Sequence, residues 1–130
     1  MNLLLDTHIW IWSLLEPKKL SIAARKALDD SGNDLFLSPI SVWETIVLHR
    51  KGKIDLGPDP FIWVETALYT VPIQEAPLNL SVAVQSEKLE LDWKDPADRF
   101  LAATAAVYDL ILITRDSHFQ RKTGFRVIKG

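Results

Sequence analysis

Residues 95–116 read DPADRFLAATAAVYDLILITRD, and this stretch decides the class of fold. Asp95 followed by Pro96 is a capping residue before a proline, a combination that favours the start of a helix. The apolar run behind it predicts the longest helix of the chain, reaching about Leu110. Residues 110–114 are apolar at four consecutive positions and predict a short strand with both faces buried. A helix that leads into such a strand indicates an α/β protein with a parallel sheet.

The same alternation of short apolar strands and helices runs through the rest of the chain. Further strands are expected at 3–5, 34–38, 69–73 and 125–128, and helices at about 7–15, 21–30, 39–51, 61–68 and 79–89. Pro72 places the third of these strands at an edge, because proline donates no hydrogen bond to a neighbouring strand. We therefore expect one α/β domain spanning residues 1–130, with a mainly parallel central sheet covered on both faces.

Composition narrows the class of protein. The chain has 130 residues, the usual size of one domain, with a hydrophobic content of 48%. It contains no cysteine, which excludes disulfides and thiolate ligands and is consistent with a reducing cytoplasm. The net charge of -2 lacks the basic excess of a nonspecific nucleic-acid binder. Asp6 and His8 interrupt the apolar N-terminal run, which is too short for a membrane span, so we expect neither a signal peptide nor a membrane protein.

Four acidic residues are expected to converge at one edge of this sheet. Asp6 follows the first strand, and Asp116 comes two residues after the strand that ends at Thr114. Glu44 lies in the second turn of one helix, and Asp98 lies in the first turn of another. Strand ends and helix starts meet at the carboxyl edge of a parallel sheet, where ligands bind. The four side chains can therefore meet although they are distant in sequence.

Each acid also has a simpler structural interpretation. Asp6 and Asp116 could be helix N-caps, each worth about 1 kcal/mol. Ser41 and Glu44 have the spacing of a capping box, although an earlier serine–proline pair already begins that helix. Asp98 stands three residues after the aspartate that starts its own helix, so a capping role is possible there too. Caps act singly, however, and need not share one edge of the sheet.

Two apolar stripes favour a shared ligand over separate caps. Glu44 lies on the stripe of Ile40, Val47 and Leu48, and Asp98 lies on the stripe of Leu101, Ala102 and Ala105. We expect both stripes to face the sheet, and neither carries a lysine or arginine that would neutralise the acid. Clustered carboxylates repel one another unless a cation binds them. Oxygen ligands without cysteine predict Mg²⁺ or Mn²⁺, and such a site supports phosphodiester hydrolysis.

Four motifs, in the order in which they occur along the chain, resemble those of the PIN-domain ribonucleases. The motifs are LLLDTH, SPISVWE, DPADRFLAATA and LITRD, and together they span residues 3–116. Within that family the sequence is most similar to the VapC toxins of bacterial and archaeal toxin–antitoxin pairs. The resemblance implies a three-layer α/β/α sandwich. It also implies that the metal-binding and catalytic acids are Asp6, Glu44, Asp98 and Asp116.

The same resemblance implies a function and partners. It indicates a cytoplasmic endoribonuclease that uses Mg²⁺ or Mn²⁺, cuts RNA and acts as the toxin of a type II toxin–antitoxin system. It further implies a homodimer, and an antitoxin whose C-terminal segment covers the active site, often with a basic side chain near the acids. Thr7 and Thr114 are expected to orient a carboxylate or hold water. Asp95 is expected to cap its helix or to support the metal ligands from behind.

Several other residues lie next to the predicted acids. Arg99 and Arg115 are candidate contacts to RNA phosphate, although both could equally be solvated surface residues. His8 and His118 each follow one of the acids by two positions and could assist proton transfer. Packing or hydrogen bonding is the commoner role for such a histidine. Trp93 is the tryptophan expected to border the site.

Two other functions remain open from the residues alone. A phospho-accepting regulatory domain would also use a parallel sheet, strand-end aspartates and Mg²⁺. It would need an acidic pair after the first strand and a lysine after the last long strand, whereas here Asp6 is alone and Arg115 follows Thr114. A noncatalytic partner-binding module could keep the PIN-like fold without binding metal.

Overall fold

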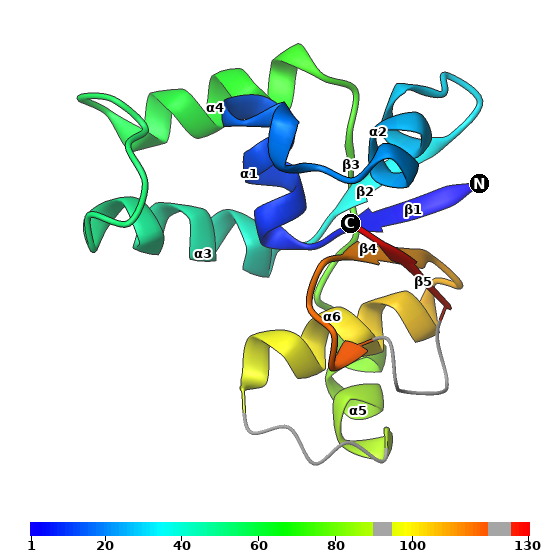
Figure 1. Cartoon of the computed structure of the whole chain (residues 1–130). Helices are drawn as coiled ribbons and strands as arrows, with labels where there is room; N and C mark the ends of the chain where they lie inside the picture. The colour runs from blue at the N-terminus through cyan, green and yellow to red at the C-terminus, as the bar shows by residue number, and fades with distance from the viewer. Residues whose placement is uncertain (90–94, 120–125) are drawn as a thin grey trace.

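A parallel sheet of five strands separates two layers of helices (Figure 1). The computed structural model describes residues 1–89, 95–119 and 126–130. The strands are β1 (Asn2–Leu5), β2 (Asp34–Leu37), β3 (Gln74–Glu75), β4 (Ile111–Thr114) and β5 (Arg126–Lys129). Their order across the sheet is β3-β2-β1-β4-β5, and every pairing is parallel. The predicted α/β/α sandwich with a mainly parallel sheet is therefore confirmed.

The helices begin where the sequence offers capping side chains. They are α1 (Thr7–Leu15), a 3₁₀ turn η1 (Pro17–Lys19), α2 (Ile22–Asp29), α3 (Pro39–Arg50), α4 (Pro60–Thr70), α5 (Leu80–Lys88) and α6 (Pro96–Val107). Ser21, Ser38 and Asp95 accept hydrogen bonds from the first turns of α2, α3 and α6, as predicted. Within the described ranges, no helix combines the length and the apolar character that a membrane crossing requires.

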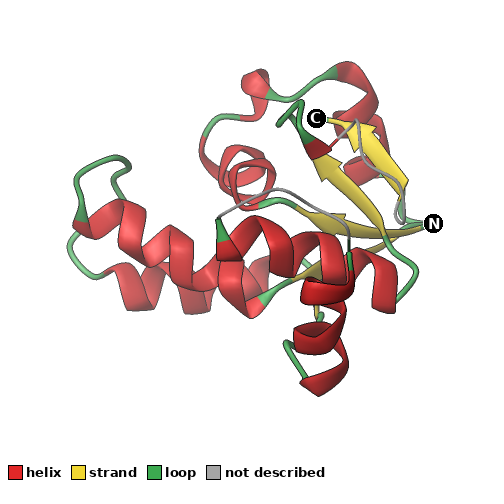
Figure 2. Ribbon diagram, turned by 90° about the horizontal axis from the view of Figure 1, so that it is seen from below, coloured by secondary structure: helices red, strands yellow, loops and turns green. Residues whose placement is uncertain are grey.

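Alternating side chains of β1 and β4 build a core on each face of the sheet. Leu3 and Leu5 belong to a cluster that includes residues of α1, α2 and α4. Leu4 and Leu112 belong to a second cluster, which contains Leu101, Ala102 and Ala105 of α6. All four leucines are almost completely buried. Period-two alternation with apolar residues on both faces is what a doubly covered parallel strand requires, and Figure 2 shows the strands as one layer among the helices.

The central strands end side by side. Leu5 of β1 pairs with Ile113 of β4, and the backbone N–H of Asp6 donates to the carbonyl of Ile113 at 3.0 Å. Asp6 is therefore level with Thr114, the last residue of β4. On its other side β1 pairs with β2, which ends at Leu37, one residue before the cap of α3. This edge of the sheet is the one at which the sequence predicts a site.

Two local predictions are wrong. The strand expected at 69–73 is absent: α4 continues to Thr70, and the edge strand β3 occupies only Gln74–Glu75. Tyr, Thr and Val favour strands. In α4, however, Val64 and Ala67 are buried three residues apart on one face, and this packing stabilises a helix. The stripe of Ile40, Val47 and Leu48 in α3 is only partly buried, because α3 turns the small residues Ser41 and Thr45 inward instead.

Candidate active site

Asp6 and Asp116 are connected through one buried threonine. The hydroxyl of Thr114 donates to Asp6 Oδ2 at 2.6 Å and accepts the backbone N–H of Asp116 at 3.1 Å. The other oxygen of Asp6 accepts the backbone N–H of Thr7 at 2.7 Å, at the start of α1. Asp6 therefore does cap α1, but its second oxygen also fixes its orientation toward the β4 end.

Glu44 is held against the same edge by Thr7. The Thr7 hydroxyl donates to Glu44 Oε1 at 2.8 Å and lies 3.0 Å from the hydroxyl of Ser41. Thr7 and Ser41 are both buried. No hydrogen bond of a capping box is found between Ser41 and Glu44 in the described residues, since Ser38 already caps α3. The carboxylate of Glu44 instead faces α1, one hydroxyl group away from the segment that carries Asp6.

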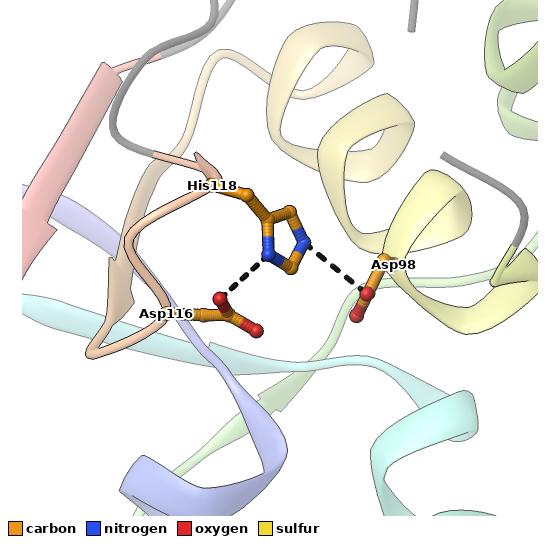
Figure 3. Close-up of side chains that lie close together, drawn as sticks. All are labelled: Asp98, Asp116 and His118. Atoms are coloured by element: carbon orange, nitrogen blue, oxygen red, sulfur yellow. Dashed lines mark ion pairs between the residues drawn. The ribbon is translucent and has the colours of Figure 1, made fainter. Parts of the chain in front are cut away.

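Asp98 and Asp116 flank a histidine (Figure 3). His118 Nδ1 lies 2.6 Å from Asp116 Oδ1, and His118 Nε2 lies 3.3 Å from Asp98 Oδ2. Asp98 comes from the first turn of α6, whereas the other two residues come from the turn after β4. One ligand atom from each of the three side chains lies within 4.8 Å of the others. His118 thereby links the start of α6 to the turn after β4.

The carboxylates are close enough to disturb one another's ionisation. Burial raises the pKa of Asp6, against the lowering effect of its bonds to Thr114 and Thr7, and Asp116 raises it further. Burial likewise raises the pKa of Glu44, to which the charge of Asp6 adds. Burial and the charge of Asp95 raise the pKa of Asp98 to about 6; His118 lowers it, and Asp6 and Asp116 raise it by smaller amounts. These effects show that the four acids share one electrostatic environment.

Of the residues predicted to lie beside the acids, Asp95 stabilises its helix and also affects the site, whereas Arg99 has a structural role. Asp95 caps α6 by accepting the backbone N–H of Ala97 at 3.0 Å, and its charge also raises the pKa of Asp98 and Glu44. Arg99 points to α5, where it donates to the carbonyl of Ser86 at 2.6 Å, and its side chain is only 15% exposed. That geometry gives Arg99 a structural role between α6 and α5. The candidate Trp93 lies outside the described residues.

Arg115, a predicted contact to RNA phosphate, has an exposed side chain next to the acidic edge. Its guanidinium lies over the ring of Trp12 at 4.6 Å from the centroid. Its Nε donates to the carbonyl of Gly130 at 3.4 Å. His8 is also exposed, in the first turn of α1, with its ring 5.5 Å from that of Trp12. Cationic and aromatic groups thus border the acidic edge on the side of α1.

Comparison with known proteins shows the family of this chain. The family model described as the PIN domain matches residues 3–124, which is nearly the whole chain. The chain belongs to the PIN-domain family. A relative in Mycobacterium tuberculosis, ribonuclease VapC22, is 31% identical over 116 residues, covering 88% of this chain and 87% of that protein. The family suggested by the four sequence motifs is thereby confirmed.

Solved structures show the same PIN fold. A VapBC2 complex from Rickettsia felis, bound to a DNA fragment from its promoter, matches with a TM-score of 0.73 at 14% identity, over 100% of this chain and 99% of that one. A toxin–antitoxin complex from Klebsiella pneumoniae matches with a TM-score of 0.63 at 25% identity, over 97% of this chain and 95% of that one. The architecture of the sheet and helices is therefore that of other PIN-domain proteins.

The chemistry of this PIN domain's donor set fits a divalent cation. PIN domains generally use such a metal. The ligand atoms of Asp98, Asp116 and His118 already lie within reach of one ion. The burial and mutual repulsion that raise the pKa of Asp6, Glu44 and Asp98 would also be offset by a cation, which favours the ionised carboxylates.

Sequence reasoning missed two residues of this PIN site or ranked them too low. The sequence suggests Ser41 only as a capping residue, whereas its hydroxyl lies 3.0 Å from that of Thr7, inside the site. Its position three residues before Glu44, on the same side of the helix, is the signal that could have revealed it. For His118 the sequence leaves open proton transfer beside Asp116 and, more commonly, packing; the side chain stacks on Phe119 and also lies between two of the predicted acids.

Removing the Thr114 hydroxyl tests whether the orientation of Asp6 matters. Thr114→Val keeps the shape of the buried side chain but leaves Asp6 Oδ2 without its 2.6 Å donor. We expect metal affinity and RNA cleavage to fall about 10- to 100-fold, the usual loss when the partner of a metal ligand is removed. Calorimetric titration with Mn²⁺ and a cleavage assay would measure this.

A matched control is available in α6. Thr104 is equally buried, and among the described residues its hydroxyl bonds only to the carbonyl of Phe100, one turn earlier in the same helix. Thr104→Val should leave metal affinity unchanged. Equal losses in the two valine variants would contradict the orienting role of Thr114.

Proposed function

We propose that this PIN-domain protein is a metal-dependent endoribonuclease that acts as the toxin of a type II toxin–antitoxin system. The observation that carries the proposal is a series of contacts at one edge of the sheet. Thr7 and Thr114 hold Glu44 and Asp6, and Asp98 and Asp116 flank a histidine. The pKa values of three of these acids are raised. The name of the M. tuberculosis relative, a ribonuclease, supports the same class of reaction. In this proposal the whole chain, residues 1–130, acts as one PIN-like domain.

The four acids would hold Mg²⁺ or Mn²⁺. A bound divalent ion orients and activates water and stabilises the charge that develops on phosphate oxygens during hydrolysis. The chain's own contribution is orientation: Thr114 and Thr7 each donate to one carboxylate at 2.6 to 2.8 Å. The positive ends of α1 and α6 lie beside Asp6 and Asp98 and favour their ionised forms.

RNA would approach from the side of α1. Arg115 is exposed there and would contact a phosphate group. A surface hollow of about 600 Å³ beside it is lined by residues that include His8, Trp12, Lys19 and Lys53. Cations interleaved with an aromatic ring suit the backbone and bases of a single strand. Acidic residues also line the hollow, so the phosphate contact would depend on the basic side chains nearest the site.

An antitoxin is the expected protein partner. The R. felis and K. pneumoniae structures are, by their descriptions, a VapBC assembly and a toxin–antitoxin complex. In the present protein an antitoxin segment would cover the acidic edge and place a basic side chain near the carboxylates, where it would offset their repulsion. The proposed complex would act in the cytoplasm.

A homodimer would cover apolar side chains that the single chain leaves exposed. Trp43 in α3 and Phe61, Ile62 and Tyr69 in α4 are all more than half exposed, with Tyr69 at 95%. The helices that carry them project sideways from the sheet (Figure 1). Large exposed apolar groups on adjacent elements are typical of an interface. These exposed side chains support the proposal that two copies associate through α3 and α4.

Expression of the chain without an antitoxin tests the proposed function. The unchanged protein should arrest growth and create new RNA 5′ ends, whereas Asp6→Asn should do neither. Asp34→Asn is the control, because Asp34 is an exposed acid at the opposite end of the sheet, where β2 begins. Arrest by Asp6→Asn would contradict the proposal. A stable phospho-adduct after incubation with acetyl phosphate would favour the regulatory-domain alternative, and failure to bind Mn²⁺ would favour the noncatalytic module.

A further inference from the structure

We propose that His118 is a nitrogen ligand of the metal in this site, and that it makes the site prefer Mn²⁺ over Mg²⁺. The inference rests on the proposed function, because it concerns the same acidic edge. It adds an imidazole to a set of ligands that the sequence predicts to consist of oxygen atoms alone. Its basis is the orientation of the His118 ring between Asp98 and Asp116.

The contact with Asp116 determines which nitrogen faces the site. His118 Nδ1 lies 2.6 Å from Asp116 Oδ1, a distance that requires a proton between the two atoms. Nδ1 is therefore the donor, and in the neutral imidazole Nε2 carries the lone pair. Metal-binding histidines typically donate their other ring N–H to a carboxylate, which fixes the tautomer and ring orientation. The pair of His118 and Asp116 has this arrangement. In this inference Asp116 therefore supports the metal from behind the ring, through His118, while Asp98 and His118 face it directly.

The contact with Asp98 requires either a proton or a metal ion between the two atoms. In the neutral tautomer, Nε2 and Asp98 Oδ2 both present lone pairs, yet they lie only 3.3 Å apart. Two such atoms repel unless a proton or a metal ion lies between them. Adjacent ligands of an octahedral ion bound at about 2.1 Å are about 3 Å apart, close to the observed separation. His118 Nε2 and Asp98 Oδ2 are therefore spaced as neighbouring ligands of one metal.

The position of His118 is supported by the core. Phe119, the next residue, is completely buried in the cluster that includes Leu101 and Leu112. The His118 and Phe119 rings are stacked, with centroids 4.7 Å apart and planes inclined by 25°. A side chain held by packing and by a hydrogen bond keeps its ligand atom in place at small entropic cost. His118 is thus attached to a fixed part of the molecule, next to its proposed metal partner.

A nitrogen ligand changes the choice of metal. Mg²⁺ is bound almost entirely by oxygen, whereas imidazole suits transition metals, among which Mn²⁺ also accepts carboxylates. Replacing one oxygen ligand by imidazole should therefore weaken Mg²⁺ binding more than Mn²⁺ binding. Relative to a site with oxygen ligands alone, we expect the ratio of Mn²⁺ to Mg²⁺ affinity to rise about tenfold or more.

Pulsed electron paramagnetic resonance of bound Mn²⁺ tests the inference without an activity assay. A directly bound imidazole nitrogen gives a nuclear modulation that changes when ¹⁵N-histidine replaces ¹⁴N-histidine, without any substitution. The chain has only three histidines, so the source of the signal can be assigned. His118→Gln should abolish the histidine modulation and lower the Mn²⁺ to Mg²⁺ affinity ratio about tenfold. His8→Gln, the control at the neighbouring exposed histidine, should retain both.

The outcomes separate this inference from the proposed function. Mn²⁺ binding without a histidine modulation, or a modulation lost in His8→Gln but kept in His118→Gln, would overturn the role of His118 and leave the metal site standing. Absence of any Mn²⁺ binding would overturn the metal-dependent function itself. A modulation that responds to histidine labelling and disappears in His118→Gln would support the inference.

Discussion

Asp98→Asn should reduce RNA cleavage by about 10²-fold or more, and should make the metal-free protein more stable at pH 7. Asparagine keeps the size of the side chain but removes the negative charge that a metal needs, so the loss should reach the upper end of effects at metal sites. Without metal, the same charge is unfavourable, because burial and Asp95 raise the pKa of Asp98 to about 6. The predicted effects on activity and stability therefore have opposite signs.

The expected gain in stability of Asp98→Asn can be estimated from the raised pKa of Asp98. A rise from 3.8 to about 6 corresponds to roughly 3 kcal/mol at about 1.36 kcal/mol for each pH unit. Asp98 is partly exposed and keeps a contact to His118, so we expect Asp98→Asn to gain on the order of 1–2 kcal/mol in free energy of unfolding. Urea denaturation at pH 7 in the presence of a chelator would measure it.

The control again uses the acid at the other end of the sheet. Asp34→Asn removes a charge at the exposed start of β2 and should leave cleavage and stability nearly unchanged. Full activity in Asp98→Asn would contradict the assignment of Asp98 to the site. A loss of stability in metal-free Asp98→Asn would contradict the repulsion on which the metal argument depends.

The metal-free protein should lose stability as the pH rises from about 4 to about 6. The unfolded chain releases the Asp98 proton near pH 3.8, whereas the folded chain releases it near 6. Between these values the folded state binds more protons, so the free energy of unfolding falls with rising pH and the contribution of Asp98 levels off above that range. The pKa values of Asp6 and Glu44 are raised in the same direction and add to the fall.

A divalent cation should reverse this loss. Binding to the folded state alone adds about 2.7 kcal/mol when the free metal concentration is a hundred times the Kd. Unfolding curves at pH 4, 5, 6 and 7, with chelator and with Mn²⁺, would measure both effects. In chelator the unchanged protein should show a steeper decline than Asp98→Asn. Identical pH profiles for the two proteins would show that Asp98 does not titrate as the structure indicates.

Much of the fold could be predicted because local and global signals agree. The apolar run in 110–114 and the Asp95–Pro96 start of α6 each have one dominant interpretation. Both are confirmed, with the strand at Ile111–Thr114. The small residues Ala102 and Ala105 are completely or almost completely buried behind Asp98, as the stripe on that helix predicts. The prediction that the four acids share one edge rests on the rule that the carboxyl ends of parallel strands lie together.

The predictions that were wrong or incomplete depend on packing between elements, which the sequence of one segment does not reveal. Residues 69–73 favour a strand by composition, but the packing of α4 extends the helix to Thr70. The orientation of α3 depends on its contacts with α1 and α4, which bury Ser41 and Thr45 and leave the larger apolar side chains partly exposed. The position of His118 depends on how the turn after β4 is anchored by Phe119. Periodicity describes one element, whereas these positions are set by packing between elements.

Anomalous diffraction from crystals of the protein grown with Mn²⁺ tests the central claim most directly. The claim is that Asp6, Glu44, Asp98 and Asp116 together hold a divalent cation at the carboxyl edge of the sheet. We predict an anomalous peak among these four carboxylates and no such peak in Asp98→Asn crystals grown in the same way. A fully occupied Mn²⁺ site elsewhere on the molecule, with no peak at this edge, would contradict the account.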